Sequence, residues 1–164
     1  KLLNYMGDIY GRDGFTIRPI LLRPKSRGSI TLKSNNPKDA PNIDPRLLSH
    51  PDDVTTLVEG RHGEPLTTNP LPECRGEAYG SDAYWTCYVR HMSSAFYHLC
   101  GGCKMAPASD PYSVVDNKLK VRGVFGLRVV GAPIMPAVTS GNTNVPVVMI
   151  AEKASDIIKQ DWNS

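Results

Sequence analysis

The stretch Gly126-Leu-Arg-Val-Val-Gly-Ala-Pro-Ile-Met-Pro-Ala-Val-Thr-Ser-Gly-Asn-Thr-Asn-Val-Pro-Val-Val-Met-Ile-Ala-Glu-Lys-Ala-Ser-Asp156 decides the fold of this chain. It passes from a short apolar strand through a loop rich in Gly, Pro, Ser and Asn into an amphipathic helix. Such an arrangement presents loop backbone and a helix N-terminus to a ligand. We therefore expect this segment to hold an anion or a cofactor.

The helix at the end of this stretch is predicted over residues 145–162, and Pro146 is compatible with its first turn. Apolar residues at helical spacing mark the face that we expect to be buried: Val148, Ala151, Ala154, Ile158 and Trp162.

A second amphipathic helix is predicted to begin at Ser81, whose hydroxyl suits an N-cap. Large apolar side chains recur after it three or four residues apart: Trp85, Tyr88, Val89, Met92 and Phe96. The pattern predicts that this helix delivers His98 at its C-terminal end, beside the turn in Tyr97-His-Leu-Cys-Gly-Gly-Cys-Lys-Met105. Most histidines are surface or satisfied core residues, but one at the edge of a core is suited to proton abstraction.

Together, these two stretches resemble the C-terminal part of the glucose-methanol-choline (GMC) flavoprotein oxidoreductases, and most closely their insect glucose dehydrogenase branch. The resemblance implies that His98 takes the proton of a substrate hydroxyl while hydride leaves the same carbon for the flavin. It also implies that Asn142, in Gly141-Asn-Thr-Asn-Val-Pro146, is the catalytic partner that binds the substrate oxygen. Without the resemblance, Asn142 and Asn144 are ordinary loop and cap residues.

The same resemblance implies FAD as the cofactor. The residues expected to bind it are Gly131, Ala132, Asn142, Thr143 and Asn144. Where the family usually has Asp-Ala-Ser or Asp-Gly-Ser, this chain has Gly131-Ala-Pro133, so a carboxylate contact to the cofactor is missing. Four other positions also depart from the family pattern: Leu99, Cys100, Gly102 and Ala106.

We expect an α+β fold with a mainly antiparallel substrate-domain sheet and flanking helices. Residues 15–32 are typical of a hairpin that pairs residues 15–22 with residues 29–32, and Pro19 favours an edge position in it. The segments Arg27-Gly-Ser-Ile-Thr-Leu32 and Pro41-Asn-Ile-Asp-Pro45 resemble strands of that sheet in the family.

A third helix is predicted to begin at His50-Pro-Asp-Asp53, whose acidic residues suit a first turn, and to end at Gly60. The family usually continues from this point into several further helical turns, so we expect that a segment has been deleted after Gly60.

In the family, residues 1–125 would be part of the substrate-binding domain, and the strand, loop and helix of residues 126–164 would complete the FAD-binding domain. The sequence has no Gly-x-Gly-x-x-Gly fingerprint after a first strand, so we expect the N-terminal FAD-binding half to be absent. The chain is then a fragment, inactive alone, whose partners are the rest of its parent polypeptide and a small alcohol or sugar. The alternative is a non-catalytic binding or structural relic of the family.

Composition excludes other functions. The net charge of +3 arises from 19 basic and 16 acidic residues scattered along the chain, which argues against nucleic-acid binding. No apolar run has the length that spans a bilayer.

His98, Cys100 and Cys103 could bind zinc, or the two cysteines could form a disulfide. A fourth zinc ligand at suitable spacing is missing, so no metal is expected.

Overall fold

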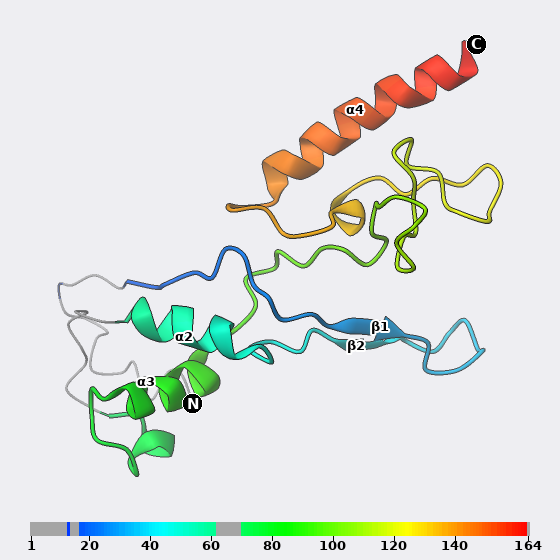
Figure 1. Ribbon diagram of the computed structural model, residues 1–164. Coiled ribbons are helices and arrows are strands. Elements are labelled where there is room, and N and C mark those ends of the chain that lie inside the picture. The colour runs from blue at the N-terminus through cyan, green and yellow to red at the C-terminus, as the bar shows by residue number, and fades with distance from the viewer. Residues whose placement is uncertain (1–12, 14–16, 62–69, 164) are drawn as a thin grey trace. The chain divides into compact units, whose positions relative to one another are not determined.

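The computed structural model describes residues 13, 17–61 and 70–163. The chain divides into two units (Figure 1). The first contains the described residues of Lys1–Leu21, Lys25–Arg27 and Arg46–Ser94, and the second contains those of Leu22–Pro24, Gly28–Pro45 and Ala95–Ser164.

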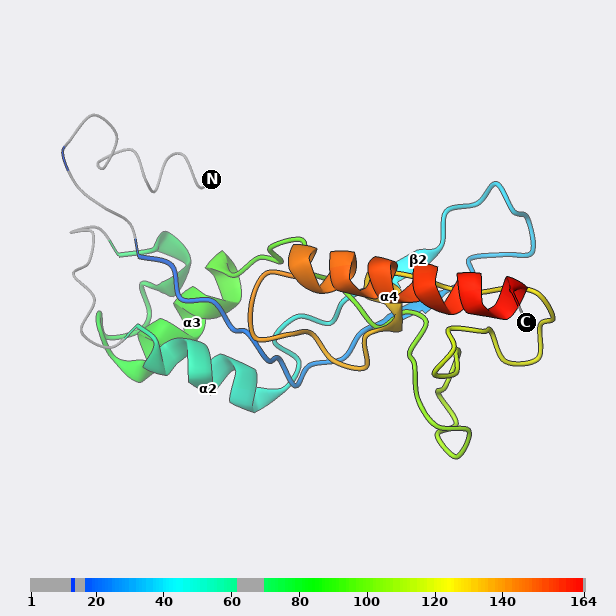
Figure 2. The same ribbon diagram turned by 90° about the horizontal axis from the view of Figure 1, so that it is seen from above.

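The first unit is built on helices α2 (Pro51–Glu59) and α3 (Asp82–Met92), which lie side by side in both ribbon views (Figures 1 and 2). A short 3-10 helix, η1 (Pro72–Cys74), packs against α3. The buried core between these elements consists of Val54, Leu57, Val58, Leu71, Cys74, Tyr84, Trp85, Tyr88 and Val89. The buried apolar face of each helix therefore supplies this core.

Both predicted helix starts in this unit are confirmed. The ring Nδ1 of His50 accepts a hydrogen bond from the Asp52 amide of α2 at 3.2 Å. The Ser81 hydroxyl oxygen accepts one from the Tyr84 amide of α3 at 3.1 Å. These side chains satisfy amide groups that have no partner within a helix. Helix α2 also ends at Gly60, as predicted.

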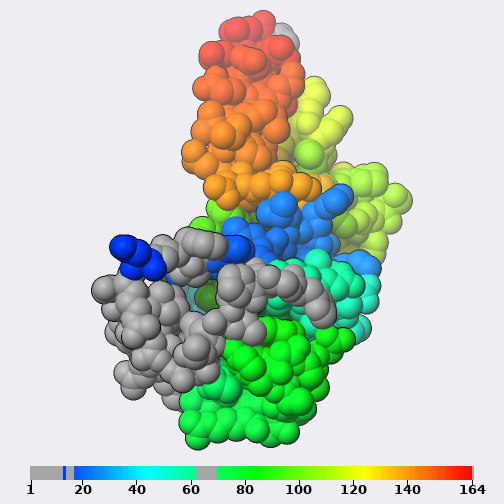
Figure 3. Space-filling view, turned by 90° about the vertical axis from the view of Figure 1, so that its left-hand side faces the viewer, coloured from blue at the N-terminus to red at the C-terminus, as the bar shows by residue number. Residues whose placement is uncertain are grey.

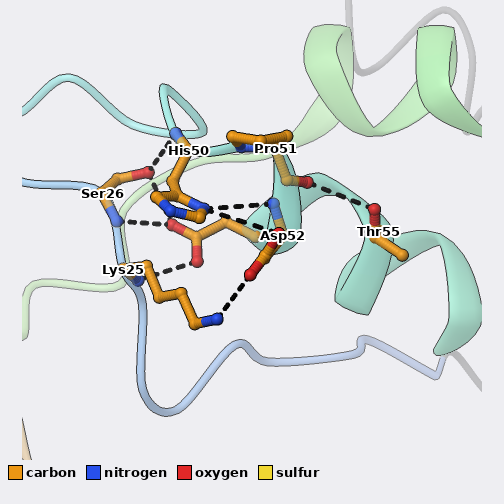
Figure 4. A network of polar contacts seen from close by, with 7 residues as sticks. Lys25, Ser26, His50, Pro51, Asp52 and Thr55 are labelled. Atoms are coloured by element: carbon orange, nitrogen blue, oxygen red, sulfur yellow. Dashed lines mark hydrogen bonds and ion pairs between the residues drawn. The ribbon is translucent and has the colours of Figure 1, made fainter.

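The carboxylate of Asp53, in the first turn of α2, is buried and joins this helix to the segment before it. It accepts hydrogen bonds from the backbone N–H groups of Lys25 and Ser26, both at 2.8 Å, and from the Ser26 hydroxyl at 2.5 Å. Ser26 Oγ also accepts the His50 amide at 3.0 Å. Figure 4 shows Lys25 and Ser26 beside the start of α2, where Lys25 Nζ also pairs with Asp52. This network fixes residues 25 and 26 against α2.

The predicted extension of α3 to His98 is wrong. The helix ends at Met92, and Ser93 is already in an extended conformation, with ψ of 144°. Serine side chains compete for backbone hydrogen bonds and favour helix ends, so Ser93 and Ser94 outweigh the apolar periodicity that Phe96 continues. Phe96 is exposed instead of completing the buried stripe. His98 therefore lies in a loop of the second unit.

A disulfide that the sequence analysis did not predict joins Cys74 of η1 to Cys87 of α3. Cys100 and Cys103 are not joined in a disulfide, so the alternative bond between them is not formed. The bond closes a loop with a sequence separation of 13 residues beside the buried Tyr84. It therefore restricts the unfolded chain around α3.

Replacing Cys74 and Cys87 together by alanine should lower the free energy of unfolding of the first unit by about 3 kcal/mol, the chain-entropy value for a loop of this size. Trp85 is 4% exposed and Trp162 is 82% exposed, so a change in tryptophan fluorescence during urea unfolding reports mainly on the first unit. The Cys100→Ala/Cys103→Ala variant is the control, since it removes two thiols and no covalent link. Equal midpoints for both variants would contradict the prediction.

The second unit contains the antiparallel pair β1 (Ser29–Thr31) and β2 (Asn42–Asp44), with Ile30 opposite Ile43. The predicted pairing of residues 15–22 with residues 29–32 is not found: residues 17–22 form no strand, and residues 15 and 16 lie outside the described residues. A Cβ atom on Gly28 would lie 2.2 Å from the Asp44 carbonyl oxygen, so glycine permits the close approach that pairs these strands. Pro19, which lacks an amide donor, lies against Gly60 in the first unit instead.

The α+β class is confirmed, but the sheet is smaller than predicted. Beyond β1 and β2, the described residues form only isolated bridges: Met105 with Val115, Val115 with Val121, and Lys120 with Arg128. The strand predicted at residues 127–130 is reduced to one of these bridges. Gly123 and Gly126 both have positive φ, so the chain turns sharply here and leaves little room for a continuous ladder.

Helix α4 (Asn144–Trp162) confirms the predicted C-terminal helix. Ala154 is buried with Val115, Leu119 and Ile134, and Ile150 packs against this cluster. Val148, Ala151 and Trp162, which were predicted on the buried face, are exposed. Much of the surface of α4 is exposed to solvent, as the space-filling view shows (Figure 3).

The last turn of α4 is held by an ion cluster. The Asp161 carboxylate pairs with Arg128, with Lys120 at 2.7 Å and with Lys118 at 3.7 Å. The hydrogen bond from Lys120, followed by the charges of the other cations, holds the pKa of Asp161 below its usual value despite desolvation. In the part of the chain that the structure describes, none of the helices is long and apolar enough to cross a bilayer.

Candidate functional site

Two segments distant in sequence form the candidate site, and backbone hydrogen bonds hold them together. The amide of Gly101 donates to the carbonyl of Ala132 at 3.3 Å, that of Cys103 to Pro133 at 2.9 Å, and that of Met105 to Ile134 at 2.9 Å. We call these three bonds the loop ladder. It fixes the loop that carries His98 to the segment that begins at Gly131.

The side chain that contacts His98 comes from the start of α4. His98 Nδ1 lies 2.9 Å from the Thr143 hydroxyl oxygen. Thr143 is buried and occupies the N-cap position, but its side chain makes no capping hydrogen bond. The other ring nitrogen, His98 Nε2, is buried and has no hydrogen-bond partner among the described residues. One nitrogen of the imidazole is thus anchored, and the other has its hydrogen-bonding capacity unused within the described residues.

The two predicted asparagines lie on either side of Thr143 and are both exposed. Asn142 belongs to the loop and Asn144 is the first residue of α4. Among the described residues, the Asn142 side chain makes no hydrogen bond. The structure therefore brings Thr143 to His98 through a side-chain contact, while Asn142 is only its neighbour in sequence. The sequence analysis assigned Thr143 to the cofactor and missed its contact with the histidine.

Gly131 and Ala132 begin the segment that the loop ladder holds. Gly131 is buried, with φ of 128° and ψ of −162°, a region that is essentially restricted to glycine. Ala132 begins the 3-10 helix η2 (Ala132–Ile134) and is half-buried. The family resemblance implied an acidic residue at position 131. The backbone found here gives a physical reason why this chain has glycine.

Gly131→Ala should lower the free energy of unfolding by about 1–3 kcal/mol, because alanine does not adopt this backbone conformation without strain. The nearest atom to an added Cβ is Pro133 Cδ at 3.7 Å, an ordinary contact, so the cost arises from the backbone. Gly141→Ala is the matched control, since a Cβ there meets no atom within 4 Å. Urea unfolding followed by circular dichroism compares the two variants, and equal stabilities would contradict the assigned conformation.

The structure does not favour the zinc alternative at His98, Cys100 and Cys103. Within the described residues, the donor atoms of these three side chains do not converge into a three-ligand group. One such group is found, formed by Cys74, Cys87 and His91, but its two sulfur atoms are joined in the disulfide. Thiolate ligands are therefore not available there while the bond is intact.

A family profile described as GMC oxidoreductase matches residues 24–151, which include His98 and the whole loop ladder. The chain belongs to the GMC oxidoreductase family. Members of the GMC oxidoreductase family are flavoproteins that bind FAD. The family inferred from the two sequence motifs is thereby confirmed.

Individual GMC oxidoreductases are similar over most of the chain. Glucose dehydrogenase (FAD, quinone) of Drosophila melanogaster is 40% identical over 97% of this chain and 28% of its own length. Alcohol dehydrogenase (acceptor) of Pseudomonas putida is 43% identical over 88% of this chain and 27% of its own length. The structure of a fungal aryl-alcohol oxidase matches with a TM-score of 0.68 and 33% identity, covering 88% of this chain and 25% of the oxidase. The chain thus spans little more than a quarter of the length of these relatives.

Proposed function

We propose that this chain is the C-terminal part of an FAD-dependent oxidoreductase that acts on the CH–OH group of an alcohol or a sugar, with His98 as the general base. The observation that carries this proposal is the environment of the imidazole. Nδ1 is hydrogen-bonded to Thr143, while Nε2 is buried and has no partner among the residues that the structure describes. A buried polar atom without a hydrogen bond is costly, so this nitrogen is best explained by a ligand that donates to it.

A substrate hydroxyl is such a donor. In the neutral imidazole one nitrogen carries the proton and the other carries a lone pair. When Nδ1–H donates to Thr143, the lone pair lies on Nε2 and can take the hydroxyl proton. The exposed amide of Asn142 is proposed to donate to the substrate oxygen as negative charge develops there.

The residues present are compatible with FAD. The Gly131 backbone has no side chain to obstruct a ligand, and the first turn of α4 has no side-chain cap. The amides of Asn144 and Val145 and the positive end of the helix dipole favour negative charge nearby. We propose that Gly131, Ala132, Asn142, Thr143 and Asn144 contact the cofactor. Bound FAD would accept the hydride from the substrate carbon.

We also propose which domain of the intact enzyme each part of the chain belongs to. Residues 1–125 would belong to the substrate-binding domain, and residues 126–164 would complete an FAD-binding domain supplied mainly by the rest of the parent polypeptide. The coverage of the relatives supports this arrangement, because this chain corresponds to little more than a quarter of each. The reaction would then require the full-length protein.

The test is to purify the full-length polypeptide that carries this chain and to record its visible absorption before and after adding alcohols and sugars. We expect a yellow protein whose flavin absorption is bleached by at least one of these compounds under anaerobic conditions. Bound flavin that no compound bleaches would favour the non-catalytic relic, an alternative that the missing carboxylate at Gly131 supports. A protein without flavin would overturn the cofactor assignment.

A further inference from the structure

We propose that Thr143 is the positioning residue for His98. Its hydroxyl oxygen accepts Nδ1–H, which keeps the lone pair on Nε2 and holds the ring in the orientation that receives the substrate proton. The inference rests on the proposed function of His98. It assigns to the Thr143 side chain a role separate from any backbone contact with the cofactor.

The first observation is that Thr143 does not perform the usual task of a threonine in its position. An N-cap threonine normally has an extended backbone and accepts a hydrogen bond from the first turn, a contact worth about 1 kcal/mol. Thr143 instead has φ of −83° and ψ of −4° and makes no side-chain cap. Its hydroxyl oxygen contacts His98 Nδ1 at 2.9 Å. Helix α4 thus lacks this stabilising side-chain cap, and the Thr143 hydroxyl contacts His98 instead.

The second observation is burial. Thr143 is 8% exposed, so water competes little for its hydroxyl. The ring of Phe96 is 6.1 Å from the imidazole, centroid to centroid, and the hydrogen bond to Thr143 is the one polar contact of His98 among the described residues. A single buried hydrogen bond therefore determines the ring orientation on this side.

The third step concerns the tautomer. If Nδ1 carries the proton, threonine accepts it and Nε2 presents a lone pair to a hydroxyl donor. If Nε2 carries the proton, threonine must donate to Nδ1, and the neutral ring has no lone pair for the substrate. Base catalysis at Nε2 therefore requires the first arrangement. Valine has nearly the shape of threonine but carries a methyl group in place of the hydroxyl. Thr143→Val therefore removes the contact that selects the tautomer and changes the side-chain volume very little.

The experiment compares Thr143→Val with Thr143→Ser in the full-length flavoprotein. The rate of anaerobic flavin bleaching at saturating alcohol or sugar should fall roughly 10- to 100-fold in Thr143→Val, less than the loss expected when a general base is removed. Thr143→Ser should stay within about threefold of the wild type, since it keeps the acceptor oxygen. Substrate affinity and flavin content should be unchanged in both. Crystal structures should show a reoriented His98 ring in Thr143→Val only.

The results separate the two proposals. Equal rates and ring orientations in the wild type and Thr143→Val would overturn the positioning role and leave His98 as the base. Equal losses in the valine and serine variants would also overturn it. If Thr143→Val loses its flavin, the test is made on the wild type labelled with ¹⁵N-histidine, by NMR. The His98 signals are identified as those that are missing from the spectrum of His98→Gln. A proton on Nδ1 supports the role, and a proton on Nε2 overturns it. Undiminished bleaching in His98→Gln would instead overturn the proposed function.

Discussion

His98→Gln in the full-length flavoprotein should slow substrate-dependent flavin bleaching by roughly 10²- to 10⁴-fold, the usual contribution of a general base. Glutamine approximates the length of histidine and can hydrogen-bond to Thr143, but it cannot accept a proton near neutral pH. The loss should therefore fall on the rate at saturating substrate. Flavin content should remain that of the wild type, because the proposed cofactor contacts are made by other residues.

His91→Gln is the matched control for this prediction. His91 is an exposed histidine near the end of α3, and its Nδ1 contacts the carbonyl of Cys87 in its own helix at 2.9 Å. Its replacement should leave bleaching within about twofold of the wild type, as surface substitutions away from a site usually do. Stopped-flow absorbance under anaerobic conditions measures both variants. Similar rates for the two would remove His98 from the reaction.

Asp53→Ala should lower the free energy of unfolding of the first unit by about 3 kcal/mol, because it leaves three partly buried hydrogen bonds without their acceptor. Two of these donors are backbone amides, of Lys25 and Ser26, and the third is the Ser26 hydroxyl. Urea unfolding followed by Trp85 fluorescence measures the change. The control is Asp52→Ala, which removes an exposed carboxylate paired with Lys25 and should change the stability much less than Asp53→Ala does.

The contribution of Asp53 should depend on pH in a defined direction. Burial is the largest single influence and favours the neutral acid, but the hydrogen bonds from Lys25 and Ser26 together outweigh it and hold the pKa of Asp53 below its usual value. A lowered pKa stabilises the folded state above the unfolded pKa, and this stabilisation is lost as pH falls through the folded pKa. The difference between wild type and Asp53→Ala should thus be constant near neutrality and shrink below about pH 4. A difference that grew in acid would contradict the assigned ionisation.

The sequence predicted the parts of the fold that local chemistry determines. The starts of α2 and α3 follow from capping side chains at His50 and Ser81, and the end of α2 follows from Gly60. The family resemblance assigned His98 and Gly131 to one site, and the loop ladder aligns the two segments that carry them. Each of these features depends on a few neighbouring residues or on a motif specific to the family.

The features that the sequence did not reveal depend on contacts between distant residues. The partner of β1 is decided by the close packing of Gly28 on Asp44, which no local periodicity records. Four cysteines allow several pairings, so their spacing did not identify Cys74 and Cys87. The contact of Thr143 with His98 spans 45 residues and required a threonine that does not cap its helix.

The loop ladder also determines which substitutions this region can accommodate. Its donors and acceptors are peptide groups, which every amino acid supplies, so side chains at positions such as Leu99, Cys100 and Gly102 can vary without altering how the two segments are aligned. Proline at position 101, 103 or 105 is excluded because it would remove a donor. Gly101 is also restricted, because its φ is 86° and an added Cβ would lie 3.2 Å from the Met135 carbonyl oxygen. Side chains around His98 can therefore change in size and polarity while the alignment of the two segments is kept.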